Sequence, residues 1–179
     1  MAETIQPHGN LLLLDTDVLI HFTKAGELHI LPSIFPAMTF CLLENVYKEL
    51  RYPAFRGAID QLIEADMLKV IEFPAGDLRI LSEYAKLRRK GLGDGESACL
   101  SVARFQFHAI GSSNLRDIKG YCRKHQIRFL TTLDFLCAAL HRQIFDEARC
   151  DQFIMTGVKQ GSRFPVRKIS DYRCRKFLL

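Results

Sequence analysis

The chain has 179 residues, a length that fits one domain. Apolar residues make up 48% of it, which is ordinary for a protein with a packed core and argues against wholesale disorder. Its longest uninterrupted aliphatic stretch, Leu11–Leu14, is far shorter than the roughly 20 residues of a spanning helix. The opening MAETIQPHGN has neither a basic region nor an apolar run, so we expect no secretory signal. These features exclude a membrane protein, a small secreted domain and a coiled coil.

Six cysteines are spread along the chain: Cys41, Cys99, Cys122, Cys137, Cys150 and Cys174. The sequence contains no CxxC pair, so neither a zinc site nor a disulfide framework is favoured. We therefore expect reduced thiols and a cytoplasmic location.

The net charge of +5 is unevenly distributed. Residues 159–179 hold seven basic residues and one acidic residue, so residues 1–158 are close to neutral. We expect residues 1–158 to form the folded domain and residues 159–179 to form a basic C-terminal extension. A basic extension favours a polyanionic partner, because Lys and Arg release counterions from phosphates. It could equally be a solubilising terminus, or dock on the domain, since its basic residues alternate with Phe164, Val166, Ile169, Tyr172 and Phe177.

Strands and helices are predicted to alternate along the chain. The continuous aliphatic run Leu11–Leu14 predicts a strand covered on both faces. Residues 39–50 carry apolar residues at helical spacing and predict a helix. Further helices are predicted over 58–67, 77–90, 94–105, 115–125 and 133–142, and further strands over 68–73, 107–111 and 127–130. This alternation predicts an α/β fold with a central parallel sheet between two layers of helices.

Polar residues follow three of the predicted strands, as Asp15-Thr16-Asp17, Ser112-Ser113-Asn114 and Thr131-Thr132. Because ligands of open parallel sheets bind outside the carboxyl ends of the strands, we expect a polar pocket at one edge of the sheet. Turn chemistry could explain any one of these segments. Asp134, just beyond the third, is interpreted chiefly as a helix cap.

Two further carboxylates occupy helix positions where charge is unexpected. Glu49 shares the edge of the apolar face of the predicted 39–50 helix, and Glu96 lies four residues before Leu100 on an inward stripe. An inward charge must be paired, metal-bound or neutralised. A divalent cation would satisfy these carboxylates together, and oxygen ligands without a histidine motif favour Mg²⁺ or Mn²⁺ over zinc. Alternatively, Glu96 complements the positive end of its helix and Glu49 reaches solvent.

Four segments between Leu11 and Gly157 resemble, in order and spacing, the PIN-domain nuclease family, which includes the VapC-type toxins. They are LLLLDTDVLIHF, VYKEL, GLGDGESACLSVAR and AIGSSNLRDIKGYCRKHQIRFLTTLDFL. The resemblance implies a three-layer α/β/α fold and metal-dependent hydrolysis of RNA. Three acids that most members of the family share are matched here by Asp15, Glu49 and Glu96. Thr16 matches the hydroxyl-bearing residue that follows the first of these acids in the family.

A fourth acidic position of the family falls on Asn114, which brings no charge. A site with three acids should bind one Mg²⁺ acceptably and a second one poorly. The expected catalytic residues are therefore Asp15, Glu49, Glu96 and Asn114, and the first three are the expected metal ligands, acting directly or through water. Thr16, Asp17 and Ser113 are expected around them, where Thr16, Ser113 and Asn114 would orient water or the outer coordination shell.

RNA binding must come from basic residues, because the acids repel phosphate. The candidates are Lys86, Arg88, Arg89 and Lys90 before the Glu96 helix, and Arg167 and Lys168 in the extension. The resemblance further implies an RNA substrate, a small antitoxin as partner and self-association into a homodimer.

Two other functions stay open at this point. Asn114 motivates a PIN-like fold with a weakened site that serves as an RNA-binding or protein-binding module. The opening pattern of Asp15 and Asp17 after an apolar strand is also shared by haloacid-dehalogenase-like phosphatases, in which Asp15 would be a nucleophile and Asp17 a general acid. That family has Thr or Val two residues after the second Asp, where this chain has Leu19. It also needs an acidic pair after a later strand, which is not found here, so the phosphatase is less favoured.

Overall fold

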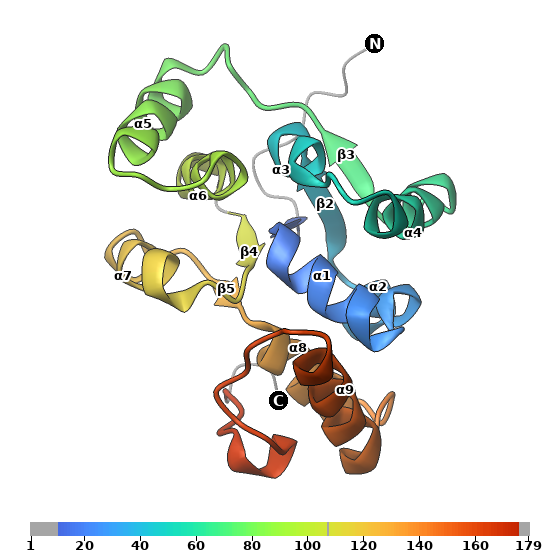
Figure 1. Ribbon diagram of the computed structural model, residues 1–179. Coiled ribbons are helices and arrows are strands. Elements are labelled where there is room, and N and C mark those ends of the chain that lie inside the picture. The colour runs from blue at the N-terminus through green and yellow to red at the C-terminus, as the bar shows by residue number, and fades with distance from the viewer. Residues whose placement is uncertain (1–10, 107, 176–179) are drawn as a thin grey trace.

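The computed structural model describes residues 11–106 and 108–175 (Figure 1). The strands in this part of the chain form one parallel sheet of five, in the order β3-β2-β1-β4-β5. Their bounds are β1 Leu11–Leu14, β2 Thr39–Leu43, β3 Lys69–Ile71, β4 Ala109–Gly111 and β5 Phe129–Leu130. Leu12 of β1 pairs with Phe40 on one side and with Ala109 on the other. The predicted α/β fold with a central parallel sheet is confirmed.

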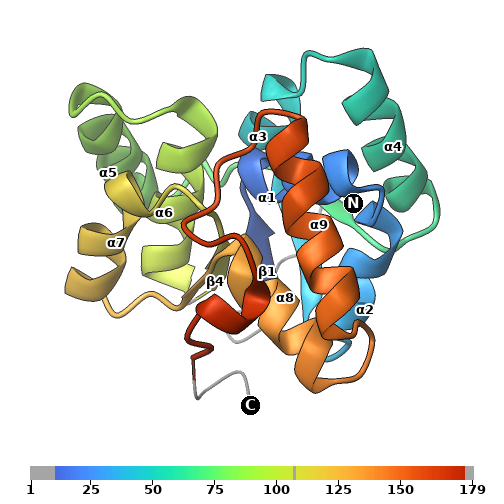
Figure 2. The ribbon, with the colours of Figure 1, turned by 60° about the horizontal axis from the view of Figure 1, so that its bottom comes forward.

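Helices cover both faces of the sheet. Their bounds are α1 Thr16–Ala25, α2 Leu31–Ile34, α3 Glu44–Glu49, α4 Pro53–Glu64, α5 Leu78–Arg89, α6 Asp94–Gln106, α7 Leu115–Lys124, α8 Thr132–His141 and α9 Glu147–Lys159. Short 3₁₀ turns occupy Leu28–Ile30 and Ile169–Asp171. Figure 1 shows α5, α6 and α7 on one side of the sheet and α1, α2 and α4 on the other. Helix α9 packs against α1 (Figure 2).

The central strand β1 is buried on both faces. Leu12, Leu13 and Leu14 are each 0% exposed. A strand that alternates polar and apolar residues would place polar groups against one helix layer, so only a continuous aliphatic run fits this position. The interpretation of Leu11–Leu14 from the sequence is therefore confirmed.

The predicted helix over residues 39–50 is wrong in its first half. Thr39–Leu43 form β2, which lies between β1 and β3, and α3 begins only at Glu44. Leu42 and Leu43 are fully buried in the sheet. Because a strand inside a parallel sheet is apolar at every position, it also supplies apolar residues at helical spacing, and the two patterns merged.

The order in which strands are added to the sheet reverses at β1. β2 and β3 lie on one side of this strand, whereas β4 and β5 lie on the other. The carboxyl ends of β1 and β4 therefore flank the crevice where open parallel sheets bind their ligands. Asp15 follows β1 there and Ser112 follows β4, and the backbone N–H of Asp15 donates to the carbonyl of Gly111 at 2.8 Å.

The described part of the C-terminal segment, residues 160–175, docks on α8 and α9. Ile169 is buried, and its N–H donates to Asp151 Oδ1 at 2.7 Å. The hydroxyl of Tyr172 donates to Oδ1 of the buried Asp134 at 2.9 Å. Arg175 Nε lies 3.2 Å from the same oxygen of Asp134. Residues 169–171 form a 3₁₀ turn, and the described part of the segment docks on the domain, one of the alternatives left open by its sequence.

A disulfide joins Cys137 of α8 to Cys174, so the expectation of six reduced thiols is wrong. Docking of the C-terminal segment brings the two Cα atoms to 5.8 Å, a separation that a disulfide requires. These cysteines are 37 positions apart, and their sequence context gives no sign of the contact. The other four, Cys41, Cys99, Cys122 and Cys150, are free and buried.

Membrane insertion by a helix has no support in residues 11–106 and 108–175, where no helix is both long enough and apolar enough to span a bilayer.

Candidate active site

A cavity of about 360 Å³ opens where the carboxyl ends of β1 and β4 meet α3 and α6. Its wall includes the carboxylates of Asp15, Asp17, Glu49 and Glu96 together with Asn114, and Thr16 and residues 90–93 complete it. The acidic cavity thus receives side chains from four separate segments of the chain.

Asp15 is held by the start of α1 and by the end of β4. It is only 7% exposed and is the N-cap of α1, where its Oδ1 accepts a hydrogen bond from Thr16 N at 2.8 Å. Its Oδ2 accepts one from Ser112 Oγ at 3.1 Å. Burial raises the pKa of Asp15, the charge of Glu49 raises it further, and the hydrogen bonds from Thr16 and Ser112 oppose the rise.

Asp17 shares the hydroxyl of Ser112 with Asp15. Its Oδ2 accepts hydrogen bonds from Ser113 N at 2.7 Å and from Ser112 Oγ at 3.4 Å. Its Oδ1 is buried and accepts no hydrogen bond from the described residues. Burial and the negative charge of Asp15 raise the pKa of Asp17 to about 7. A buried carboxylate oxygen without a donor is costly unless a cation or water completes its surroundings.

Glu49 comes from the last turn of α3, and its Oε1 accepts a hydrogen bond from Gly95 N, in the first turn of α6, at 2.8 Å. Glu49 is exposed, so the expectation of an inward charge at the edge of the apolar face is wrong, and the alternative, in which Glu49 reaches solvent, is the one observed. The contact needs close packing, because a Cβ at Gly95 would lie 2.9 Å from Val46 Cγ2. The N-terminal turn of α6 therefore holds this carboxylate, which the positive end of a helix favours.

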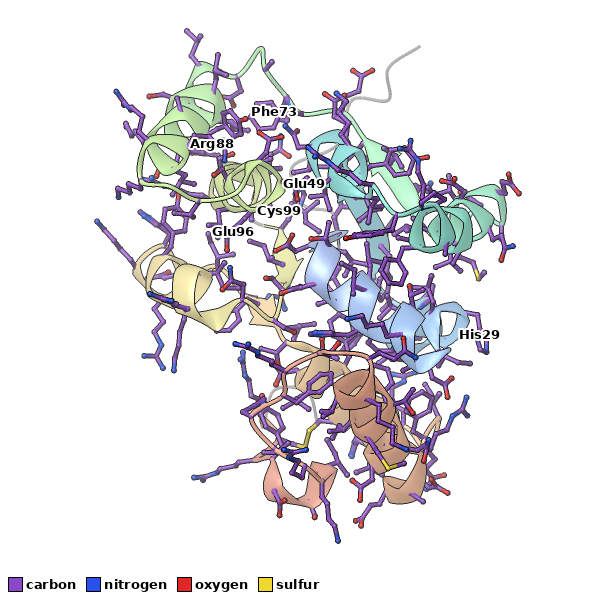
Figure 3. All side chains as sticks on the ribbon, viewed as in Figure 1. His29, Glu49, Phe73, Arg88, Glu96 and Cys99 are labelled. Carbon is purple, nitrogen blue, oxygen red and sulfur yellow. A yellow bond between two sulfur atoms is a disulfide. The ribbon has the colours of Figure 1, made fainter. Side chains whose placement is uncertain are left out.

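Glu96 lies one residue further along α6 and is 8% exposed. Its Oε1 accepts a hydrogen bond from Asn114 Nδ2 at 3.0 Å. Figure 3 shows Glu49 on α3 and Glu96 and Cys99 on α6 close together, whereas His29 lies far from them beyond α1. The amide of Asn114 thus lines the cavity and contacts one of its acids directly.

The pKa of the buried Cys99 thiol is affected by all four acids. Burial raises its pKa well above the ordinary value, and the negative charges of Asp15, Glu49, Asp17 and Glu96 each add to the rise. The four carboxylates therefore lie close enough to Cys99 for their charges to act on the same thiol.

A second network joins Ser113 and Thr132, polar residues that the sequence placed after β4 and β5, to His21 of α1, which the sequence did not suggest. Ser113 Oγ lies 2.8 Å from Thr132 Oγ1 and accepts a hydrogen bond from Thr132 N at 3.0 Å. His21 Nδ1 lies 2.9 Å from the same Thr132 Oγ1. Asp17 and His21 are four residues apart on α1, a spacing that places them on one helix face and is the one available sequence signal.

Asp134 stands apart from the acidic cavity. Its side chain accepts a hydrogen bond from Thr131 N at 2.8 Å, and Thr131 Oγ1 accepts one from Asp134 N at 3.3 Å. This is a capping box at the start of α8, so the interpretation of Asp134 as a helix cap is confirmed.

The predicted RNA-binding residues do not form one surface but lie at the acidic cavity, along α5 and beside α9. Lys90 lines the acidic cavity. Lys86 Nζ lies 3.8 Å from Glu83, Arg88 pairs with Asp94 at 3.8 Å, and Arg89 is exposed at the end of α5. Arg167 and Lys168 line a different hollow, beside α9.

The acids form a cluster and not a complete metal cage. Within the described residues, no group of three or more His, Cys, Asp or Glu side chains is arranged to hold a metal ion by itself.

Comparison with known families settles the relationship. The family described as DUF3368: PIN domain matches residues 11–156. The chain belongs to the PIN-domain family. Its family indicates a nuclease-type function, and PIN domains generally depend on divalent metals and bind nucleic acid. No match to a curated protein was found.

Proposed function

We propose that this PIN-domain protein is a Mg²⁺- or Mn²⁺-dependent endoribonuclease and that the acidic cavity is its active site. The observation that carries the proposal is the meeting of Asp15, Asp17, Glu49 and Glu96 around one cavity at the switch point of the sheet. Each acid accepts a hydrogen bond from a neighbouring residue. Ser112 contacts both Asp15 and Asp17, Gly95 donates to Glu49, and Asn114 donates to Glu96.

The residues fit a divalent cation. Asp17 Oδ1 is buried without a donor among the described residues, and the pKa values of Asp15 and Asp17 are raised by burial and by neighbouring negative charge. A bound cation would reverse both penalties. Because Asn114 is neutral, the set supports one cation better than two.

When bound, the cation would lower the pKa of a coordinated water and offset charge on the phosphoryl oxygens. Asp15, Glu49 and Glu96 would hold it, directly or through water. Ser112 fixes Asp15 and Asp17 relative to each other through its hydroxyl. Asn114 steadies Glu96, and together with Thr16 and Ser113 it would orient the attacking water or the outer coordination shell.

The substrate that we propose is single-stranded RNA, bound through Lys90 and the other cations of α5 and of the basic extension. The VapC-like segments motivate a finer proposal, in which the protein is the toxin of a toxin–antitoxin pair, binds a small antitoxin and forms a homodimer. In this proposal residues 1–158 are the PIN-like domain and residues 159–179 are its basic extension.

The test is cleavage of a fluorescent single-stranded RNA by the full chain. We expect cleavage to require Mg²⁺ or Mn²⁺ and to fall on the order of 100-fold or more in Asp15→Asn, since even outer-shell changes at metal sites cost about 10–100-fold. Asp171→Asn, at an exposed acid of the C-terminal segment, is the matched control and should retain activity.

Asn114 favours one other function, a binding module without catalysis. Salt-sensitive RNA binding with no cleavage at any metal concentration would support that function and refute the nuclease proposal. A phosphatase is disfavoured by membership of the PIN-domain family, and trapping of a phosphorylated Asp15 would be needed to restore it.

A further inference from the structure

A second cavity, the basic cleft, lies beside the acidic cavity and between α5, α6 and α7. It has a volume of about 490 Å³, and its wall includes Glu83, Arg104, Tyr121, Lys124 and His125. Lys90 and Leu92 line both cavities. The two cavities therefore meet at the segment that joins α5 to α6.

Among the described residues of the cleft wall, the one acid, Glu83, is already neutralised. Glu83 is buried, its Oε2 lies 2.8 Å from Arg104 Nη1, and its Oε1 accepts a hydrogen bond from the hydroxyl of Tyr121 at 2.9 Å. Burial opposes ionisation of Glu83, but the hydrogen bond from Tyr121 and the charge of Arg104 outweigh it and lower its pKa. This buried pair fixes the positions of Arg104 and Tyr121 without leaving a net negative charge.

The remaining charge of the cleft is positive. Lys90, Arg104 and Lys124 face one carboxylate, so the wall carries an excess of two positive charges when His125 is neutral. The ring of His125 lies 4.4 Å from that of Tyr121. Burial lowers the pKa of His125, the charges of Arg104, Lys124 and Lys90 lower it further, and Glu83 opposes them. All three cations therefore line the same cleft and lie close enough to His125 to affect its pKa.

An excess of positive charge in a polar cavity suits an oxyanion with several acceptor oxygens. The guanidinium and ammonium groups of Arg and Lys are the common partners of phosphate. The acidic cavity next door would repel phosphate unless a cation is bound, so a strand that crosses it needs anchoring close by. The basic cleft is placed to give that anchoring.

We infer that the basic cleft binds a phosphate group of the nucleic-acid strand at a position next to the phosphate that enters the acidic cavity. The inference rests on the proposed function, because it takes the acidic cavity as the place of cleavage. Its ligand class is a phosphodiester of single-stranded RNA. Free inorganic phosphate and an acidic peptide offer related anionic groups, and the test separates them.

The first measurement is the titration of His125 by NMR in full-length Asp15→Asn, which is used so that RNA stays intact. A single-stranded oligoribonucleotide should raise the pKa of His125 by about half a unit or more, because a bound phosphate offsets the neighbouring cations. Inorganic phosphate should give a smaller rise at higher concentration. A rise with phosphate or with polyglutamate, but none with the oligoribonucleotide, would overturn the inference.

The second measurement compares RNA affinity in Lys124→Ala and Lys119→Ala. Both residues are exposed lysines of α7, but only Lys124 lines the basic cleft. Lys124→Ala should weaken binding about threefold to tenfold and reduce the slope of log K against log salt by about 1. Lys119→Ala should leave both close to the unsubstituted values. Equal losses in the two variants would refute a specific cleft.

These readouts are independent of cleavage. If the RNA shifts His125 and Lys124→Ala weakens binding, but no metal supports cleavage, the nuclease proposal fails and the phosphate site stands. If the metal-dependent cleavage is found and His125 does not respond to RNA, only the phosphate site is refuted.

Discussion

Packing of α3 against α6 gives the sharpest single-residue prediction. Substitution Gly95→Ala places a Cβ 2.9 Å from Val46 Cγ2, 3.1 Å from Glu49 Oε2 and 3.2 Å from Val46 Cα. The backbone atom among these cannot rotate away, so the two helices must separate slightly. Overpacking of this kind costs about 1–3 kcal/mol.

The opposing effect is the helix propensity of Ala, which exceeds that of Gly by about 1 kcal/mol in a helix interior. Gly95 lies in the first turn of α6, where this gain is smaller. We expect a net loss of about 1–2 kcal/mol in the free energy of unfolding. For a domain of this size each kcal/mol lowers Tm by about 2–4 °C. The same displacement moves Glu49 away from Gly95 N, so metal-dependent cleavage should fall as well.

Gly57→Ala is the matched control, because Gly57 lies inside α4 with open space around its Cα. It should raise the free energy of unfolding by about 0.5–1 kcal/mol and leave cleavage unchanged. Urea unfolding followed by circular dichroism measures both variants. If Gly95→Ala is as stable as the unsubstituted protein and fully active, close packing of α6 on α3 does not position Glu49.

Three further predictions concern stability. Loss of the disulfide in Cys174→Ser should lower the free energy of unfolding by about 2–4 kcal/mol. In the unsubstituted protein, alkylation after unfolding without reduction should label four cysteines of six. Labelling of all six would contradict the disulfide. Asp134→Ala removes a fully buried carboxylate that pairs with Arg175, so unfolding should become easier by about 3–5 kcal/mol in urea titrations. In the folded protein, burial lowers the pKa of His21 from 6.5 to about 4, with a smaller contribution from the charge of Lys24. The contribution of neutral His21 to the free energy of unfolding is therefore complete above pH 6.5 and is lost as the pH falls towards 4. His21→Gln should therefore lose less stability between pH 7 and pH 4.5 than the unsubstituted protein, by at most about 3 kcal/mol, and equal losses would refute this account.

The fold could be predicted from the sequence where one pattern had one explanation. The aliphatic run before Asp15 fits only a strand covered on both faces, and it placed Asp15 at the carboxyl end of that strand, where the polar pocket is predicted. Residues 39–50 had two explanations, because the apolar strand β2 passes directly into α3. Glu49 was singled out first by its place on the predicted 39–50 helix and then by its match to the family motif. The helix argument began on residues that belong to the sheet, so the match is the sounder of the two reasons.

Contacts between distant segments could not be predicted from local patterns. The Cys137–Cys174 disulfide depends on how the C-terminal segment docks on α8, and neither cysteine has a distinctive neighbourhood in the sequence. The basic cleft likewise needs α5, α6 and α7 to be placed side by side, since Arg104 and Lys124 belong to different helices. The bridging hydroxyl of Ser112 between Asp15 and Asp17 follows from strand order, which the sequence does not reveal.

The most direct test of the acidic cavity is a crystal of the full chain soaked in Mn²⁺ and measured at the manganese absorption edge. We predict one anomalous peak within coordination or water-bridged distance of Asp15, Glu49 and Glu96, and its disappearance in Asp15→Asn. Manganese bound elsewhere, with none near these three carboxylates, would contradict the proposal that they form a catalytic metal site.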